Sequence, residues 1–223
     1  MKTPHLFRSP RPWRLLLLAL LACAPPGVQA QALSGLRVLP HAGPDYTFSG
    51  WQSEGTVPAV LTVPLDLGDD VYGATLQVQP ATPGETYRVR VQYETSLGLS
   101  ADGPHLDLTG WKHCVSEWRT AQAIDALSFV LPAPTAEQGE CFPRYTPGEL
   151  ETAVRAHARK AGDPAMAARW LDGLRTPVSD VSPRVSPVSP FVAISGVRVK
   201  IEAFRNRTWV EVATVVFVPP MGC

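Results

Sequence analysis

The stretch Pro83-Gly84-Glu85-Thr86-Tyr87-Arg88-Val89-Arg90-Val91-Gln92-Tyr93 decides the class of fold that we expect for this chain. A Pro-Gly turn signal is followed by a strict alternation of apolar and polar side chains, which is typical of a half-buried β-strand. The tyrosines and valines should face a hydrophobic core. The polar face, which carries Arg88 and Arg90, should then face outward as a candidate contact surface.

Short runs rich in Val, Leu, Tyr and Trp extend this pattern over residues 36–131. Clusters such as Gly68-Asp69-Asp70 and Ala101-Asp102-Gly103-Pro104 separate them. Turn signals at spacings of about 8–12 residues are typical of antiparallel sandwiches and barrels. Strands and helices do not alternate here, which argues against a doubly wound sheet. We therefore expect an all-β fold, an antiparallel β-sandwich.

A helical pattern interrupts the strands after residue 145. Thr146-Pro147-Gly148-Glu149 reads as a capping box with proline at the first helical position, and Gly162 ends the first helix. Asp163-Pro164 begins a second helix that stops at Gly173. We expect a short helical hairpin inserted into the sandwich at about residues 146–175.

Two features follow the helices. The segment 176–190 repeats Val-Ser-Pro three times, and proline at that density favours an extended connector. The alternating residues 197–203, the turn at Arg205-Asn206 and the run from 208 to 218 predict a final hairpin. This hairpin is too apolar to stand alone, so we expect residues 31–223 to form a single domain.

Residues 1–30 have the pattern of an export signal. Four basic residues precede the apolar run 15–22, which is too short to cross a bilayer. Val28-Gln29-Ala30 fits a leader-peptidase cleavage site, which predicts a secreted or periplasmic protein. Leu20-Leu21-Ala22-Cys23 also resembles a bacterial lipobox, so lipidation at Cys23 and anchoring in the envelope is the alternative.

The charge balance argues against nucleic acid as a partner. The whole chain has 20 basic and 20 acidic residues, and removal of residues 1–30 would leave 16 basic and 20 acidic ones. Nucleic-acid-binding domains are basic. A membrane contact is expected only through an N-terminal lipid.

Three cysteines follow the expected signal, namely Cys114, Cys141 and Cys223. An exported protein meets an oxidising compartment, so one disulfide is expected. Cys114–Cys141 closes the shorter loop and is preferred, and Cys141–Cys223 is the alternative. None of them has a metal-binding spacing such as C-x-x-C.

Candidate site residues fall into two groups. Asp66, Asp69 and Asp70 form the densest acidic cluster, and carboxylates in a glycine-bearing loop can hold a structural Ca²⁺. Trp111 and Trp118 should face opposite sides of their strand, so one of them should lie outside the core. An exposed aromatic ring beside Arg88 or Arg90 would be a platform on which sugars stack. No other cofactor is expected.

No recognised catalytic motif occurs in the sequence. The histidines lack a nucleophile and an orienting group that would complete a catalytic set. A hydrolase would instead require acids such as Asp102, Asp107 and Glu117 to converge in a pocket. We therefore do not expect an enzyme, and a hydrolase remains the second alternative.

Three motifs give the chain a resemblance to carbohydrate-binding jelly-roll modules of the galactose-binding-like type. Trp51-Gln52-Ser53-Glu54-Gly55, Tyr72-Gly73 and Pro83-Gly84-Glu85-Thr86-Tyr87 stand in the order found in those modules, within residues 46–131. The helical hairpin departs from their pattern. The resemblance implies a jelly-roll sandwich, Ca²⁺ in a loop, glycan binding through exposed aromatic residues, and no catalysis.

These observations lead to one functional expectation and one main alternative. The expected protein is an exported, non-catalytic binding module of the bacterial envelope or secretome, with a polysaccharide or envelope protein as its partner. The alternative is a structural or assembly protein of the envelope, lipid-anchored through Cys23.

Overall fold

The computed structural model describes residues 33–41, 43–49, 59–101, 105–175 and 187–221. These residues belong to one compact unit that begins at Gln31. The expected export signal, including Cys23, lies outside the described residues. Within the described part, no helix has both the length and the apolar character needed to cross a bilayer.

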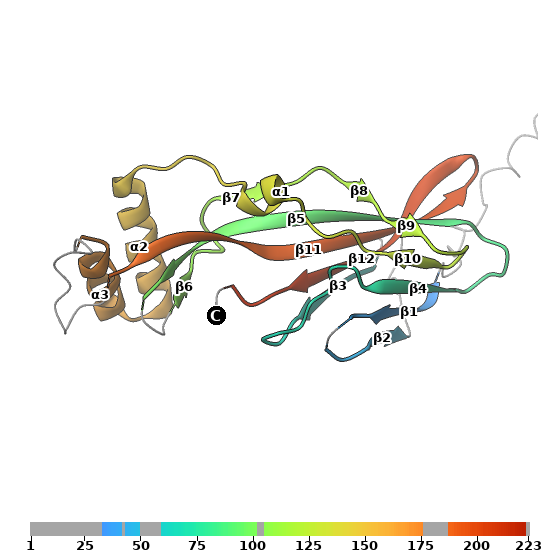
Figure 1. The fold of residues 1–223 in the computed structure, drawn as a ribbon, viewed down its shortest axis with the longest axis horizontal. Helices are drawn as coiled ribbons and strands as arrows, with labels where there is room; N and C mark the ends of the chain where they lie inside the picture. Colours follow the sequence, from blue (N-terminus) through green and yellow to red (C-terminus); the bar gives the residue numbers. More distant parts are fainter. Residues whose placement is uncertain (1–32, 42, 50–58, 102–104, 176–186, 222–223) are drawn as a thin grey trace, which may run out of the picture. The chain divides into compact units, whose positions relative to one another are not determined.

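The described residues form two β-sheets and a short helical region (Figure 1). The first sheet has the strand order β2-β1-β4-β10-β9, and all its pairs are antiparallel. Its strands are β1 (Leu33–Leu39), β2 (Tyr46–Ser49), β4 (Thr75–Pro80), β9 (Gln122–Ala123) and β10 (Ser128–Val130).

The second sheet has the order β3-β12-β11-β5-β6, and β7 and β8 also pair with β5. Its strands are β3 (Ala59–Pro64), β5 (Tyr87–Ser100), β6 (His105–Asp107), β7 (His113–Val115), β8 (Arg119–Thr120), β11 (Ser189–Arg205) and β12 (Thr208–Val218). One pair contradicts the expectation of a purely antiparallel fold, because β3 runs parallel to β12. This pairing satisfies the edge that the β11–β12 hairpin would otherwise leave open.

Apolar side chains from both sheets form one continuous cluster, which we call the first core. Its members are Leu33, Leu36, Val38, Val63, Leu65, Val71, Ala74, Leu76, Val78, Tyr87, Val89, Val91, Tyr93, Ala121, Phe129, Leu131, Val197, Val199, Ile201, Ala203, Ala213, Val215 and Phe217. The alternation in β5 therefore has the expected sense, with Tyr87 to Tyr93 facing inward at every second residue.

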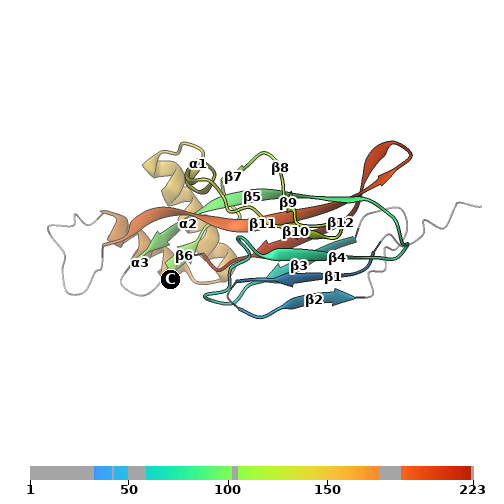
Figure 2. The same cartoon turned by 45° about the vertical axis from the view of Figure 1, so that its right-hand side comes forward.

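The antiparallel pair of β5 and β11 continues beyond the first core (Figures 1 and 2). A β-bulge at Ser195 interrupts the register, and such an extra residue bends and twists its strand. Past the bulge, Phe191 lies over Gly98, where an added Cβ would be 2.3 Å from the ring.

The strand β11 begins at Ser189, so the expected connector 176–190 is wrong at its last two residues. Residues 176–186 of that connector lie outside the described part.

A second cluster of buried side chains, which we call the second core, covers this far end of the pair. It joins β5, β6 and the following loop to the helices α2 (Pro147–Ala161) and α3 (Pro164–Arg175). Its members are Leu97, Leu99, Leu106, Leu108, Leu150, Ala153, Val154, Ala158, Ala167, Trp170 and Leu171.

The two helices confirm the helical hairpin expected at 146–175. Thr146 and Glu149 form the capping box at the start of α2, and Gly162 ends it with a left-handed φ of 72°. A third helix, α1 (Ala136–Glu140), was not expected. Thr135 and Gln138 form its capping box. The T-x-x-Q spacing in the sequence is the signal that could have predicted it.

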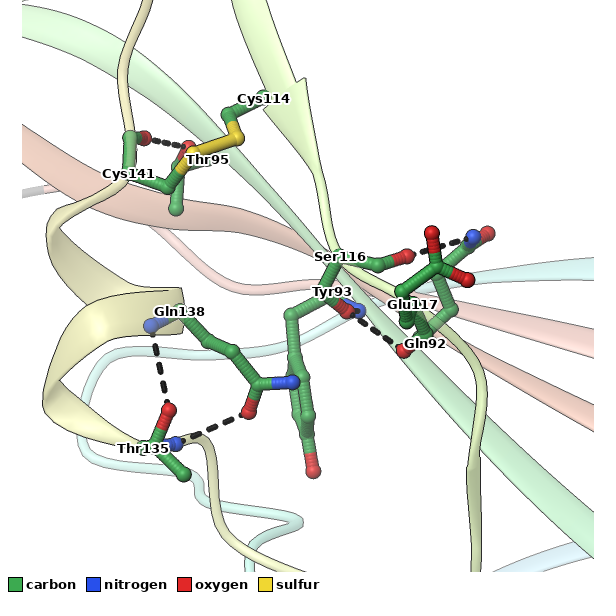
Figure 3. Close-up of a disulfide and its surroundings, with 9 residues drawn as sticks. All are labelled: Gln92, Tyr93, Thr95, Cys114, Ser116, Glu117, Thr135, Gln138 and Cys141. Carbon is green, nitrogen blue, oxygen red and sulfur yellow. Dashed lines mark hydrogen bonds between the residues drawn. A yellow bond between two sulfur atoms is a disulfide. The ribbon is translucent and has the colours of Figure 1, made fainter.

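The disulfide joins Cys114 of β7 to Cys141, directly after α1, as preferred from loop length (Figure 3). The segment that it fixes covers the inward face of β5 at the junction of the two cores. The Tyr93 hydroxyl donates to the carbonyl of Pro132, and the Thr95 hydroxyl donates to that of Cys141. These bonds satisfy polar groups that the segment buries.

Candidate functional site

The outward face of β5 and β11 carries a regular array of charged side chains. The register places Arg88 opposite Glu202, and Arg90 opposite Lys200. Arg88 Nε lies 2.7 Å from Glu202 Oε2, and Lys200 Nζ lies 3.0 Å from Glu211 Oε2 on β12. The expected polar face of β5 is therefore one row of a wider surface, which we call the outer face.

Trp118 lies on this face and contacts two of its cations. It stands in the short connection between β7 and β8, both of which pair with β5. The Lys200 Nζ atom is 4.3 Å from the centroid of the indole, and the Arg90 Cζ atom is 5.8 Å from it. Trp118 is only partly buried. The ring and the two cations thus form a cation–π group that is partly exposed to solvent.

A second aromatic residue, Trp209, lies on the same face of the sheet. The Arg88 Cζ atom is 4.6 Å from its ring centroid, and the Phe204 ring is 5.1 Å away. Sequence reasoning missed Trp209 and Lys200 as candidates. The alternation of residues 197–203 signalled a polar face for Lys200, but the sequence did not reveal that this strand pairs with β5.

The tight turn of the β11–β12 hairpin lies at the end of the outer face that is opposite to the second core. Asn206 and Arg207 adopt left-handed φ values of 48° and 64°, which match a two-residue hairpin turn. Arg205 and Tyr87 both donate hydrogen bonds to Glu85. Burial alone would raise the pKa of Glu85, but these two bonds lower it overall, so the carboxylate stays charged and fixes the hairpin.

Arg90 differs from the other cations of the outer face. Arg88, Lys200 and Arg198 each form an ion pair, the last with Glu94 at 3.1 Å. Within the described residues, Arg90 is in no ion pair, and its contact with Trp118 is cation–π in character. Its guanidinium can therefore take up an anionic group of a ligand in two parallel hydrogen bonds.

Trp111 does not join the outer face. Its ring lies 6.1 Å from Phe142 and 5.6 Å from Tyr145, beside the second core. Trp111 and Trp118 therefore lie in different parts of the fold, and of the two only Trp118 is beside Arg90. Only residues 113–115 of that run are in β7, and the loops on each side of β7 carry the two tryptophans to different parts of the fold.

The acidic cluster near β3 has structural partners for two of its three carboxylates. Asp69 accepts a hydrogen bond from the Tyr46 hydroxyl at 2.6 Å, and Asp70 accepts one from the Tyr72 amide at 2.7 Å. Burial and the bond to Asp69 raise the pKa of Tyr46 to about 12. No group of three or more metal-binding side chains occurs among the residues with described positions. Calcium at Asp66, Asp69 and Asp70 stays a prediction.

The acids considered for hydrolysis do not meet. Asp107 pairs with Gly98 of β5, whereas Glu117 follows Ser116, whose carbonyl accepts from Gln92. Six residues of strand separate these positions, which is about 20 Å. Glycosidase carboxylates lie about 5–9.5 Å apart. Asp102 lies outside the described residues.

No protein-family model matches the chain, and no similar curated protein or solved structure was found. The chemistry of the outer face is therefore the basis on which a function can be assigned.

Proposed function

We propose that this protein is an exported, non-catalytic β-sandwich module that binds polysaccharide on its outer face. The observation that supports this proposal is the position of Trp118, which is partly exposed and contacts both Arg90 and Lys200. A jelly-roll connectivity of the galactose-binding-like type is part of the same proposal.

The chemistry of the outer face favours an acidic polysaccharide. An indole ring offers a flat apolar surface on which the C–H face of a sugar packs. Arg90 has no ion-pair partner among the described residues, so its guanidinium is available to a uronate carboxylate beside that sugar. A sheet face is flat, which suits a long polymer better than a small enclosed ligand.

Two further features support export. The disulfide Cys114–Cys141 is of the kind that persists in oxidising compartments. The basic residues and apolar run within 1–30 have the order of an export signal.

Binding of the purified protein to a polyuronate and to neutral dextran, measured by calorimetry, tests the proposal. We expect Trp118→Ala to weaken polyuronate binding at least 10-fold, because stacking is lost. We expect Arg90→Gln to weaken it about 5-fold, which is the strength of an exposed charge pair. The control is Arg37→Gln on the first sheet, where an exposed arginine pairs with Asp45 at 2.6 Å. Equal binding by Trp118→Ala and the unaltered protein would contradict the proposal.

A structural or assembly role in the envelope is the second candidate. Phe204 and Val210 are exposed at the end of the β11–β12 hairpin, where they are available to a protein partner. The intact mass of the natively produced protein distinguishes the two roles. A chain that begins at Gln31 agrees with free export, whereas one that begins at Cys23 with added acyl mass favours the anchored role.

A further inference from the structure

A hollow of about 470 Å³ lies between α2 and the loop that follows β6, away from the outer face. Small residues make this space. Ala153 and Ala156 line it from the helix, and Gly110 lines it from the loop. An added Cβ at Gly110 would meet no atom within 4 Å, which shows how open this wall is.

The inner walls of the hollow are apolar and held in place. Leu108 is 2% exposed and belongs to the second core. Trp111 forms another wall, and its ring is fixed by contacts with Phe142 and Tyr145, which are themselves 5.9 Å apart. Side chains that are locked by such packing form a preorganised site.

The basic side chains of the hollow lie along one side of α2. His157 and Lys160 both line it and are three residues apart, so they stand on the same side of the helix. Within the described residues, Lys160 forms no ion pair. An apolar hollow with an unpaired cation is complementary to a molecule that has an apolar body and an anionic end.

A partly buried carboxylate, that of Asp107, lies close to this side of the hollow. His105 Nε2 is 3.7 Å from Asp107 Oδ2, while Asp107 Oδ1 is buried without a hydrogen-bond partner in the described structure. Burial raises the pKa of Asp107, although the charges of His105 and His157 oppose this. His157 and Asp107 are thus close enough to interact electrostatically at this side of the hollow.

We propose that this hollow binds a single-chain amphipathic carboxylate, such as a free fatty acid. The acyl chain lies against Leu108, Trp111 and the alanines of α2, and the carboxylate pairs with Lys160. This site is separate from the outer face, and it does not depend on polysaccharide binding.

Quenching of tryptophan fluorescence by dodecanoate with a terminal bromine atom tests this site in the full chain, below the concentration at which micelles form. Trp111 lines the hollow, so a bound chain brings the bromine close to its ring. We expect saturable quenching that unlabelled dodecanoate reverses. Dodecanol should compete at least 5-fold less well, because it cannot pair with Lys160.

Three variants locate the binding. Ala156→Leu fills the hollow from an exposed helix position that tolerates leucine, and it should weaken binding at least 10-fold with an unchanged circular dichroism spectrum. Lys160→Gln should weaken it about 5-fold. Arg159→Gln removes the neighbouring exposed cation, which does not line the hollow, and should have no effect. All variants contain the same residues 1–30, so any binding of the probe to that segment is equal in all of them. Equal affinity of Ala156→Leu and the unaltered chain, or of dodecanol and dodecanoate, would overturn the proposal.

Discussion

The first and second cores share two strands but use them differently. Over residues 87–93, β5 buries alternate side chains, because one face lies on the first sheet and the other carries Arg88 and Arg90. Over residues 95–99 every side chain is buried. Here the helices cover one face, and Phe191 packs over Gly98 on the other. The covering layer, and not the strand itself, therefore decides how many faces of β5 are buried.

The makeup of the two cores differs in the same way. The first core is built largely from Val and Leu of paired strands, which interdigitate on pleated surfaces. The second core fills the space between a strand pair and two helices mainly with leucines and alanines, together with one valine and one tryptophan. Partly buried rings of Trp111, Phe142 and Tyr145 pack at its margin. The margin of the second core leaves the hollow beside Trp111.

The largest effects are expected from truncation of each core in turn. Ile201→Ala in the first core and Leu99→Ala in the second both remove side chains with no solvent exposure. Each should lower the free energy of unfolding by about 2–5 kcal/mol. Because β5 and β11 run through both cores, we expect one cooperative transition in urea for both variants. Loss of the helical signal in a separate, earlier transition for Leu99→Ala would show that the two cores unfold independently.

Removal of the disulfide should have the next largest effect. Cys114 and Cys141 are 27 residues apart, and their bond fixes the segment that covers β5 between the two cores. The double variant with serine at both positions should lose about 2–4 kcal/mol of stability, which the urea midpoint measures. A reducing agent should lower the midpoint of the unaltered protein but not that of the double variant. An equal response of both proteins would contradict the prediction.

The smallest effect is expected at the start of α2, which belongs to the second core alone. A hydrogen bond from Lys112, followed by bonds from Thr146, lowers the pKa of Glu149 from 4.5 to about 2. A depressed pKa in the folded state means that Glu149 stabilises the fold above pH 4.5 and that this contribution is lost as the pH falls toward 2.

The urea midpoint of Glu149→Gln should therefore differ from that of the unaltered protein at pH 6 and approach it near pH 2. Glu140→Gln, which removes an exposed carboxylate on α1, serves as the control for the general effect of a lost negative charge. A difference that stays constant down to pH 2 would show that Glu149 does not act through its charge.

The sequence predicted best where one face of a strand is solvated. The alternation from Tyr87 to Tyr93 predicted the strand, its inward face and its outward face. It did so because side chains on one face are buried and those on the other face contact solvent. The same strand continues to Ser100, and the sequence Thr95-Ser96-Leu97-Gly98-Leu99 gave no period of two, because both faces are covered there. The start of β11 was hidden by Pro190, a residue that argues against a strand on local grounds.

The candidate site was predictable only in part, for a similar reason. Arg88, Arg90 and Trp118 were found from the local pattern, since each lies on or beside β5. Lys200 and Trp209 joined them only through the register of β11 with β5 and β12, which is a long-range property. The position of Trp111 beside the second core did not follow from strand alternation, because β7 is only three residues long and Trp111 precedes it in a loop.

The pairing of β5 with β11 also has a consequence for how the chain folds. Ser100 pairs with Ser189 and Tyr87 with Ala203, while Ala59 pairs with Ala213 in the parallel pair. Such distant partners give the fold a high contact order, and the entropy of closing these loops must be overcome before the central sheet gains its stabilising contacts. We expect refolding on the scale of milliseconds to seconds, because β5 can pair only after the distant β11 has formed. Until then, its unpaired edge is the part of the chain most open to intermolecular strand pairing.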